Sequence, residues 1–83
     1  MRNNLKVQRA IKNITQAELA RRIGVSRQTI NAIESQNYVP STKLALKLSR
    51  EFKLNVNEIF TLDEVDYPPI AVTEMRSQNG FSY

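Results

Sequence analysis

The sequence predicts an all-α protein, with a compact five-helix domain over residues 1–65 and a short tail over residues 66–83. Two observations lead to this prediction. Apolar side chains recur at helical spacing in successive short stretches, and capping and turn residues separate those stretches. A chain of 83 residues also has room for only one simple hydrophobic core, which short helices can enclose.

The first helix is expected from Leu5 to about Lys12. Its apolar residues are only loosely periodic, and Gln8 interrupts the expected apolar face. Asn13 follows, and asparagine is the main alternative to glycine at a left-handed helix C-cap. We therefore expect the helix to end there.

The second helix is expected to begin after Thr15, because Thr15 and Glu18 have the spacing of a capping box. Gly24 is expected to end this helix. The side chains expected on its buried side are Ala17, Leu19, Ala20 and Ile23.

A third helix follows after only two residues, Val25 and the N-cap residue Ser26, and extends to about Ser35. Ile30 and Ile33 are spaced to share its buried face. Two helices joined by so short a glycine-containing turn cannot lie antiparallel, so they cross at a steep angle, as in a helix-turn-helix. Val25 is expected to fill the space between them.

Residues 37–40 are expected to form a loop, after which Ser41 or Thr42 caps a fourth helix. Asn55 or Asn57 opens a last short helix. In the tail, residues 70–73 form one short apolar run that is compatible with a strand. The apolar residues assigned to the last two helices are Leu44, Ala45, Leu46, Leu48, Phe52, Ile59 and Phe60.

Charge is distributed unevenly along the chain. Residues 1–53 contain eleven basic and three acidic side chains, whereas residues 54–83 contain one basic and five acidic side chains. A basic body with an acidic end is expected of a surface that binds a polyanion such as nucleic acid. A solvated basic face is the alternative, and composition alone does not decide between them.

Composition excludes several classes of function. Cysteine and histidine are both absent, so the commonest metal ligands, general bases and nucleophiles are missing, and we expect no enzyme activity, metal or cofactor. No stretch approaches the roughly 20 apolar residues of a membrane span. The N-terminus lacks the apolar core of a secretory signal, so we expect a cytoplasmic location and no membrane partner.

The third helix carries the side chains most suited to reading DNA. Arginine matches the two acceptors of guanine, glutamine or asparagine matches adenine, and the threonine methyl group can contact thymine. A solvated polar face is the alternative, but the exposed start of the second helix of a helix-turn-helix is where side chains enter the major groove. The candidate base-reading residues are Arg27, Gln28, Thr29 and Asn31.

Candidate phosphate ligands flank this helix. Helix starts offer free N–H groups to phosphate, and Gln16 stands directly after a helix cap, where its side chain and backbone can both donate. Helix formation and turn chemistry are the alternative roles for Gln16 and for the loop residues. The candidate phosphate-binding residues are Gln16, Ser26, Asn37, Tyr38 and Lys43.

Two further groups of residues concern assembly. Arg9 and Glu34 are either an ion pair that ties the first helix to the third or two unrelated solvated charges. One short recognition helix contacts few base pairs, so we expect a two-fold homodimer on a palindromic operator. Ile59 and Phe60 can instead close the core of the monomer. The candidate dimer interface consists of Val56, Ile59, Phe60, Leu62, Val65 and Tyr67.

Four stretches together resemble the Cro/C1-type (lambda-repressor-like, XRE) helix-turn-helix family: residues 15–20, 24–30, 33–34 and 40–41. The resemblance covers roughly residues 4–62 and implies a five-helix domain that binds operator DNA, usually as a dimer. It also implies that Gln16 binds phosphate, that Arg27, Gln28 and Thr29 face the groove, and that Arg9 and Glu34 form a structural ion pair.

The chain departs from the family pattern after the third helix. Glu34-Ser35-Gln36-Asn37 replaces a common Glu-Asn-Gly-Lys, so Gln36 or Asn37 must supply any left-handed conformation, and one phosphate-binding lysine is missing. The sequence thus predicts a DNA-binding transcriptional regulator, in the form of a repressor. The alternative is an antitoxin-like module whose tail, residues 66–83, holds a protein partner.

Overall fold

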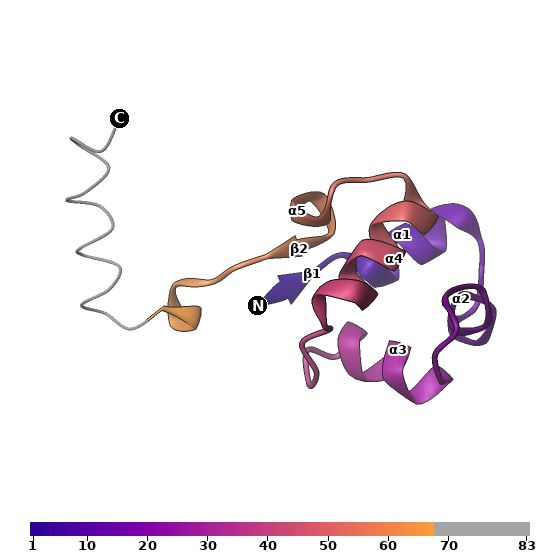
Figure 1. Cartoon of the computed structure of the whole chain (residues 1–83), viewed down its shortest axis with the longest axis horizontal. Coiled ribbons are helices and arrows are strands. Elements are labelled where there is room, and N and C mark those ends of the chain that lie inside the picture. Colours follow the sequence, from indigo (N-terminus) through magenta and orange to yellow (C-terminus); the bar gives the residue numbers. More distant parts are fainter. Residues whose placement is uncertain (68–83) are drawn as a thin grey trace.

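The computed structural model describes residues 1–67, and within them it confirms the five predicted helices (Figure 1). The helix-turn-helix is formed by the second and third of these helices. The elements in chain order are β1 (Arg2–Asn3), α1 (Leu5–Lys12), α2 (Gln16–Ile23), α3 (Arg27–Glu34), α4 (Thr42–Phe52), α5 (Val56–Ile59), β2 (Phe60–Thr61) and a 3₁₀ turn, η1 (Glu64–Asp66).

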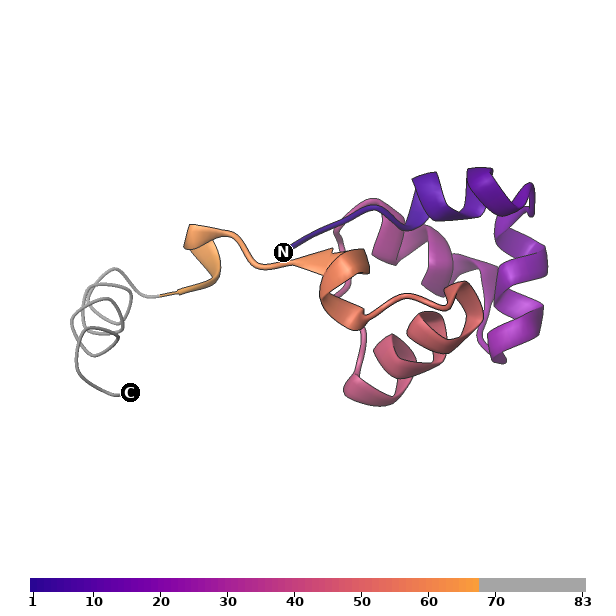
Figure 2. The same cartoon turned by 90° about the horizontal axis from the view of Figure 1, so that it is seen from above.

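The helices enclose one core, with α3 at one edge of the body and α1 and α4 above it in Figure 1. Seen from above, α1 and α4 lie along opposite sides of the body, and β2 leads the chain away from it (Figure 2). α4 begins near the loop that follows α3 and ends at the opposite edge of the body. The start of α4 therefore lies close to α3, and its end lies far from it.

Capping side chains set the helix boundaries. The hydroxyl oxygens of Thr15, Ser26 and Ser41 each accept a hydrogen bond from the backbone N–H three residues later, at 3.0 to 3.2 Å. Asn13 and Gly24 adopt left-handed conformations with φ of 56° and 75°, as predicted for the two C-caps. Local sequence therefore fixes where α2 and α3 begin and, through Gly24, how sharply the chain turns between them.

The core consists of side chains from all five helices and β2, with Val25 packed against it as predicted. Three apolar residues assigned to helix faces are exposed instead: Val7, Ile11 and Ala17. α1 turns the face of Leu5, Gln8 and Arg9 toward the body, so Val7 and Ile11 point to solvent. The buried core residues are Leu5, Leu19, Ala20, Ile23, Ile30, Ile33, Leu44, Leu48, Phe52, Ile59 and Phe60.

A small antiparallel sheet adds to the all-α prediction. β1 pairs with β2, with Arg2 opposite Thr61 and Asn3 opposite Phe60, so Phe60 lies in a strand and not in the last helix. The Asn3 side chain donates to the Ile33 carbonyl at 2.8 Å, which fastens β1 to the end of α3. Two-residue strands show no periodicity in sequence, which is why the pattern did not predict them.

The N-terminus is also tied to η1. The Met1 ammonium donates to Asp66 at 3.1 Å, and Arg2 pairs with Asp63 at 2.6 Å. The predicted domain boundary after residue 65 falls inside this turn. The predicted strand at residues 70–73 lies outside the described residues, as does most of the segment assigned to a protein partner. No helix within residues 1–67 is long and apolar enough to cross a membrane.

Candidate nucleic-acid interface

The start of α3 presents polar side chains to solvent. Arg27 and Gln28 are exposed, and neither side chain has a hydrogen bond or ion pair within residues 1–67. Thr29 is half-buried, and its hydroxyl lies 2.9 Å from the Ser26 hydroxyl, so the cap of α3 orients it. All the donors and acceptors of Arg27 and Gln28 are therefore available to a ligand outside the protein.

A hydrogen-bonded network holds α3 against α1 and α2. Arg9 Nε donates to Glu34 Oε2 at 2.7 Å, and Arg9 Nη2 donates to Oε1 at 3.1 Å, which makes the pair bidentate. Gln16 Nε2 donates to Glu34 Oε1 at 3.0 Å and to Asn31 Oδ1 at 3.3 Å. Arg9 also donates to the Ile14 carbonyl at 3.0 Å. Glu34 thereby fixes the end of α3 to both preceding helices.

The environment of this network keeps both charges ionised. Burial raises the pKa of the Glu34 carboxyl, but hydrogen bonds from Arg9 and Gln16 and the nearby charges of Arg9 and Lys6 together lower it below its ordinary value. The hydrogen bond with Glu34 raises the pKa of Arg9. With 6% of its side chain exposed, Glu34 has little access to water as an alternative partner.

The network changes what Gln16 can offer. Both hydrogens of its amide point at protein oxygens, whereas the sequence alone indicated a side chain free for phosphate. The longer bond to exposed Asn31 is the one that a phosphate oxygen can replace. The base-reading candidate Asn31 is likewise partnered through its side-chain oxygen, so only its amide hydrogens remain without a partner within residues 1–67.

The loop after α3 forms the other flank of the surface. Gln36 adopts a φ of 63° and supplies the left-handed turn for which the missing glycine left Gln36 or Asn37. Tyr38 is 45% exposed, and Asn37 and Lys43 are exposed beside it in the chain. A hollow of about 290 Å³ lies between this loop, the start of α3 and the first turns of α4. Its lining residues are Val25, Thr29, Tyr38, Ser41, Lys43, Leu44 and Lys47.

Lys47 was absent from the predicted site residues. Its ammonium group donates to the Ile23 carbonyl at 3.2 Å, which satisfies a backbone acceptor in the last turn of α2. The two residues are 24 positions apart, so no local spacing signals the contact. Lys47 links α4 to the turn of the helix-turn-helix and places one more cation beside the candidate phosphate surface.

Comparison with known proteins agrees with this geometry. The profile of a helix-turn-helix family matches residues 5–59, which span α1 to α5. The chain belongs to the helix-turn-helix family. Members of this family are DNA-binding proteins and not enzymes, which agrees with the exclusion of catalysis from composition.

Relatives of the helix-turn-helix chain come from archaea, bacteria and a phage. It is 48% identical over 64 residues to an uncharacterized HTH-type transcriptional regulator of Methanocaldococcus jannaschii, covering 77% of this chain and 97% of the relative. It is 42% identical, with the same coverage, to the uncharacterized HTH-type transcriptional regulator YgzD of Bacillus subtilis. It is 32% identical over 74 residues to the ImmF control region 10 kDa protein of Bacillus phage phi105, covering 83% and 82%.

Proposed function

We propose that this chain is a sequence-specific, double-stranded DNA-binding transcriptional regulator that acts as a repressor. α3 reads base edges in the major groove, with Arg27 and Gln28 as its free side chains and Thr29 and Asn31 beside them. The observation that carries the proposal is the combination of exposed, unpartnered donors at the start of α3 with a network that holds α3 rigidly. The names of the relatives support the regulatory role.

Phosphate contacts position the recognition helix in this proposal. The start of α2 contributes Gln16, through its backbone N–H and one amide hydrogen, and the start of α3 contributes Ser26. Asn37, Tyr38 and Lys43 approach the backbone from the other flank, around the hollow that Tyr38 and Lys43 line. Repression follows if the bound site overlaps a promoter, in the cytoplasm.

We also propose a homodimer on a palindromic operator. Ile59 and Phe60 are 1% and 7% exposed, so the monomer core already uses these two of the interface candidates. Val56, Leu62, Val65 and Tyr67 remain at least partly accessible. An apolar groove of about 200 Å³ beside Val56 extends this surface, and a second copy is the occupant we propose for it. The groove is lined by Met1, Val39, Pro40, Thr42, Ala45, Leu46, Val56 and Phe60.

The test is selection of bound fragments from random double-stranded DNA by the full-length chain. We expect enrichment of a palindrome whose half-sites lie about 10 base pairs apart, one turn of B-DNA. Enrichment of a single unrepeated half-site would remove the dimer from the proposal and keep the regulator. Absence of any enriched sequence would contradict sequence-specific recognition.

A further inference from the structure

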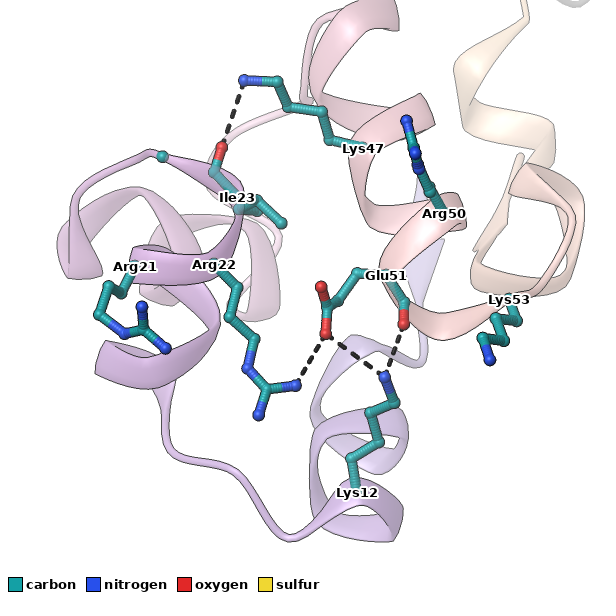
Figure 3. A pocket seen from close by; sticks show the side chains of 9 residues that line it. Lys12, Arg21, Arg22, Ile23, Lys47, Arg50, Glu51 and Lys53 are labelled. Atoms are coloured by element: carbon teal, nitrogen blue, oxygen red, sulfur yellow. Dashed lines mark hydrogen bonds and ion pairs between the residues drawn. The ribbon is translucent and has the colours of Figure 1, made fainter.

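A second basic surface lies between the end of α1, the second half of α2 and α4 (Figure 3). It is a cavity of about 670 Å³, lined by six cationic side chains and one carboxylate. None of the base-reading candidates lines it. The lining residues are Lys12, Arg21, Arg22, Ile23, Gly24, Lys47, Arg50, Glu51 and Lys53, and we call this cavity the basic cleft.

Protein acceptors use only part of this charge. Glu51 receives Lys12 at 3.3 Å and Arg22 at 2.9 Å, and Glu18, outside the cleft, receives Arg21 at 2.6 Å. These two carboxylates thus serve three cations that come from α1 and α2. Glu51 is the single anion of the lining, and it is already shared.

Arg50 and Lys53 form the unpartnered side of the basic cleft. Both are exposed, and their side chains have no hydrogen bond or ion pair within residues 1–67. Figure 3 shows them at the end of α4, above the Lys12 and Arg22 side chains that converge on Glu51. Folding contacts therefore do not account for the charge that these two residues bring to the cleft.

Charge of one sign in a concave site focuses its field and attracts a counter-ion. Guanidinium and ammonium groups arranged around one space are the usual ligands of phosphate oxygens. The volume falls within the roughly 300–1,000 Å³ of small-molecule sites, which exceeds the need of a single phosphate. Three helices wall the space, which suits a compact anion of high charge density better than an extended peptide.

The basic cleft is also separate from the proposed DNA surface. Arg50 and Lys53 lie at the end of α4, at the edge of the body opposite α3 (Figure 1). Lys47 alone lines both the basic cleft and the hollow beside Thr29 and Tyr38. An anion in the cleft would thus contact the one cation that both sites share.

We infer that the basic cleft binds a small polyphosphate anion, independently of DNA. The test is isothermal titration calorimetry of the full chain with inorganic tripolyphosphate at about 150 mM salt, without DNA. We expect saturable binding of one anion per chain. The double variant Arg50→Gln/Lys53→Gln should bind at least tenfold more weakly, and the charge-retaining variant Arg50→Lys/Lys53→Arg should keep the affinity within about threefold.

A matched control removes two charges elsewhere. Lys6→Gln/Lys43→Gln has the same net charge as the cleft variant, and its tripolyphosphate affinity should stay within about twofold of the unmodified chain. Equal loss in both variants, or no saturable binding by the unmodified chain, would overturn the inference. Equally tight binding of a pentaglutamate peptide would also overturn it, since the cleft would then accept any anion.

A DNA arm separates this inference from the proposed function. If the basic cleft is instead a contact for the DNA backbone, Arg50→Gln/Lys53→Gln will lower the salt dependence of DNA binding by one to two phosphates, about 0.9 in slope for each. That result would overturn the polyphosphate site and leave the regulator intact. An unchanged slope, with tripolyphosphate binding lost, supports the site whatever DNA sequence the chain selects.

Discussion

The side-chain amide of Gln16 donates a hydrogen bond of 3.0 Å to the carboxylate of Glu34, which joins the first turn of α2 to the last turn of α3. Glu34 is at the same time the bidentate partner of Arg9. The residue best placed to meet a DNA phosphate is therefore bonded to the ion pair that orients the recognition helix. Phosphate binding and the orientation of α3 share one network.

Gln16→Ala should consequently change two properties at once. The lost hydrogen bond to an ionised carboxylate should lower the free energy of unfolding by about 1 kcal/mol. The lost phosphate contact should weaken binding to all DNA sequences evenly. Urea unfolding and fluorescence anisotropy measure the two effects. Gln28→Ala is the matched control, because exposed Gln28 has no partner within residues 1–67, so that variant should alter base preference without altering stability.

The ion pair also predicts a dependence of stability on pH. The pKa of Glu34 is lowered in the folded chain, so its contribution is complete above the ordinary pKa of about 4.3 and is lost as pH falls through the lower folded value. Glu34→Gln should therefore cost about 2 kcal/mol at pH 7 and progressively less below pH 4, by urea unfolding. A loss of the same size at pH 7 and pH 2.5 would contradict this assignment.

Glu18→Gln supplies the contrast for that measurement. Hydrogen bonds from Arg21 and Arg22 lower the pKa of Glu18 to about 2, yet the carboxylate lies at the surface, where water screens the pair. Its replacement should destabilise the fold far less than Glu34→Gln. The comparison separates a charge that holds two helices together from one that decorates a single helix.

Local signals predicted the helices, and distant contacts escaped prediction. Thr15, Ser26 and Gly24 act on backbone groups within a few residues, so their roles can be read directly from sequence. The Gln16–Glu34 hydrogen bond spans 18 positions and depends on the angle between α2 and α3, which no spacing rule gives. Family resemblance implied the Arg9–Glu34 pair, but not the amide that completes it.

Burial showed the same division. Ala17 and Ile11 are apolar and stand at positions that a helix can bury, but burial requires a neighbouring element on that side. Within residues 1–67, α1 and α2 pack through other faces, so both residues are exposed. The opposite holds for Ile59 and Phe60, which the monomer core takes before any partner can.

Base reading is tested by Arg27→Ala, which should weaken specific binding by about 1–3 kcal/mol and relax preference at one base pair in each half-site. The reason is that Arg27 is exposed and unpartnered within the described chain. Lys43→Gln is the control, because a phosphate ligand should lower the salt slope by about 0.9 and leave base preference unchanged. An unchanged binding isotherm for Arg27→Ala would show that α3 is oriented differently.

The dimer is tested at the apolar groove. Leu46 is 57% exposed and lines the groove beside Val39 and Val56, so a carboxylate there should disfavour the burial of that surface against a second copy. Sedimentation velocity at micromolar concentration should find the unmodified chain dimeric and Leu46→Glu shifted toward monomer, with unchanged helical circular dichroism. The variant should also lose cooperative binding to a palindromic site.

Ile11→Glu provides the matched control for this experiment. Ile11 is 72% exposed on α1 and does not line the groove, so its replacement adds the same charge at another apolar surface position. The Ile11→Glu chain should sediment as the unmodified chain does. If Ile11→Glu dissociates the dimer and Leu46→Glu does not, the interface lies on α1, where Val7 is also 56% exposed, and the groove between α4, α5 and β2 is not the contact between copies.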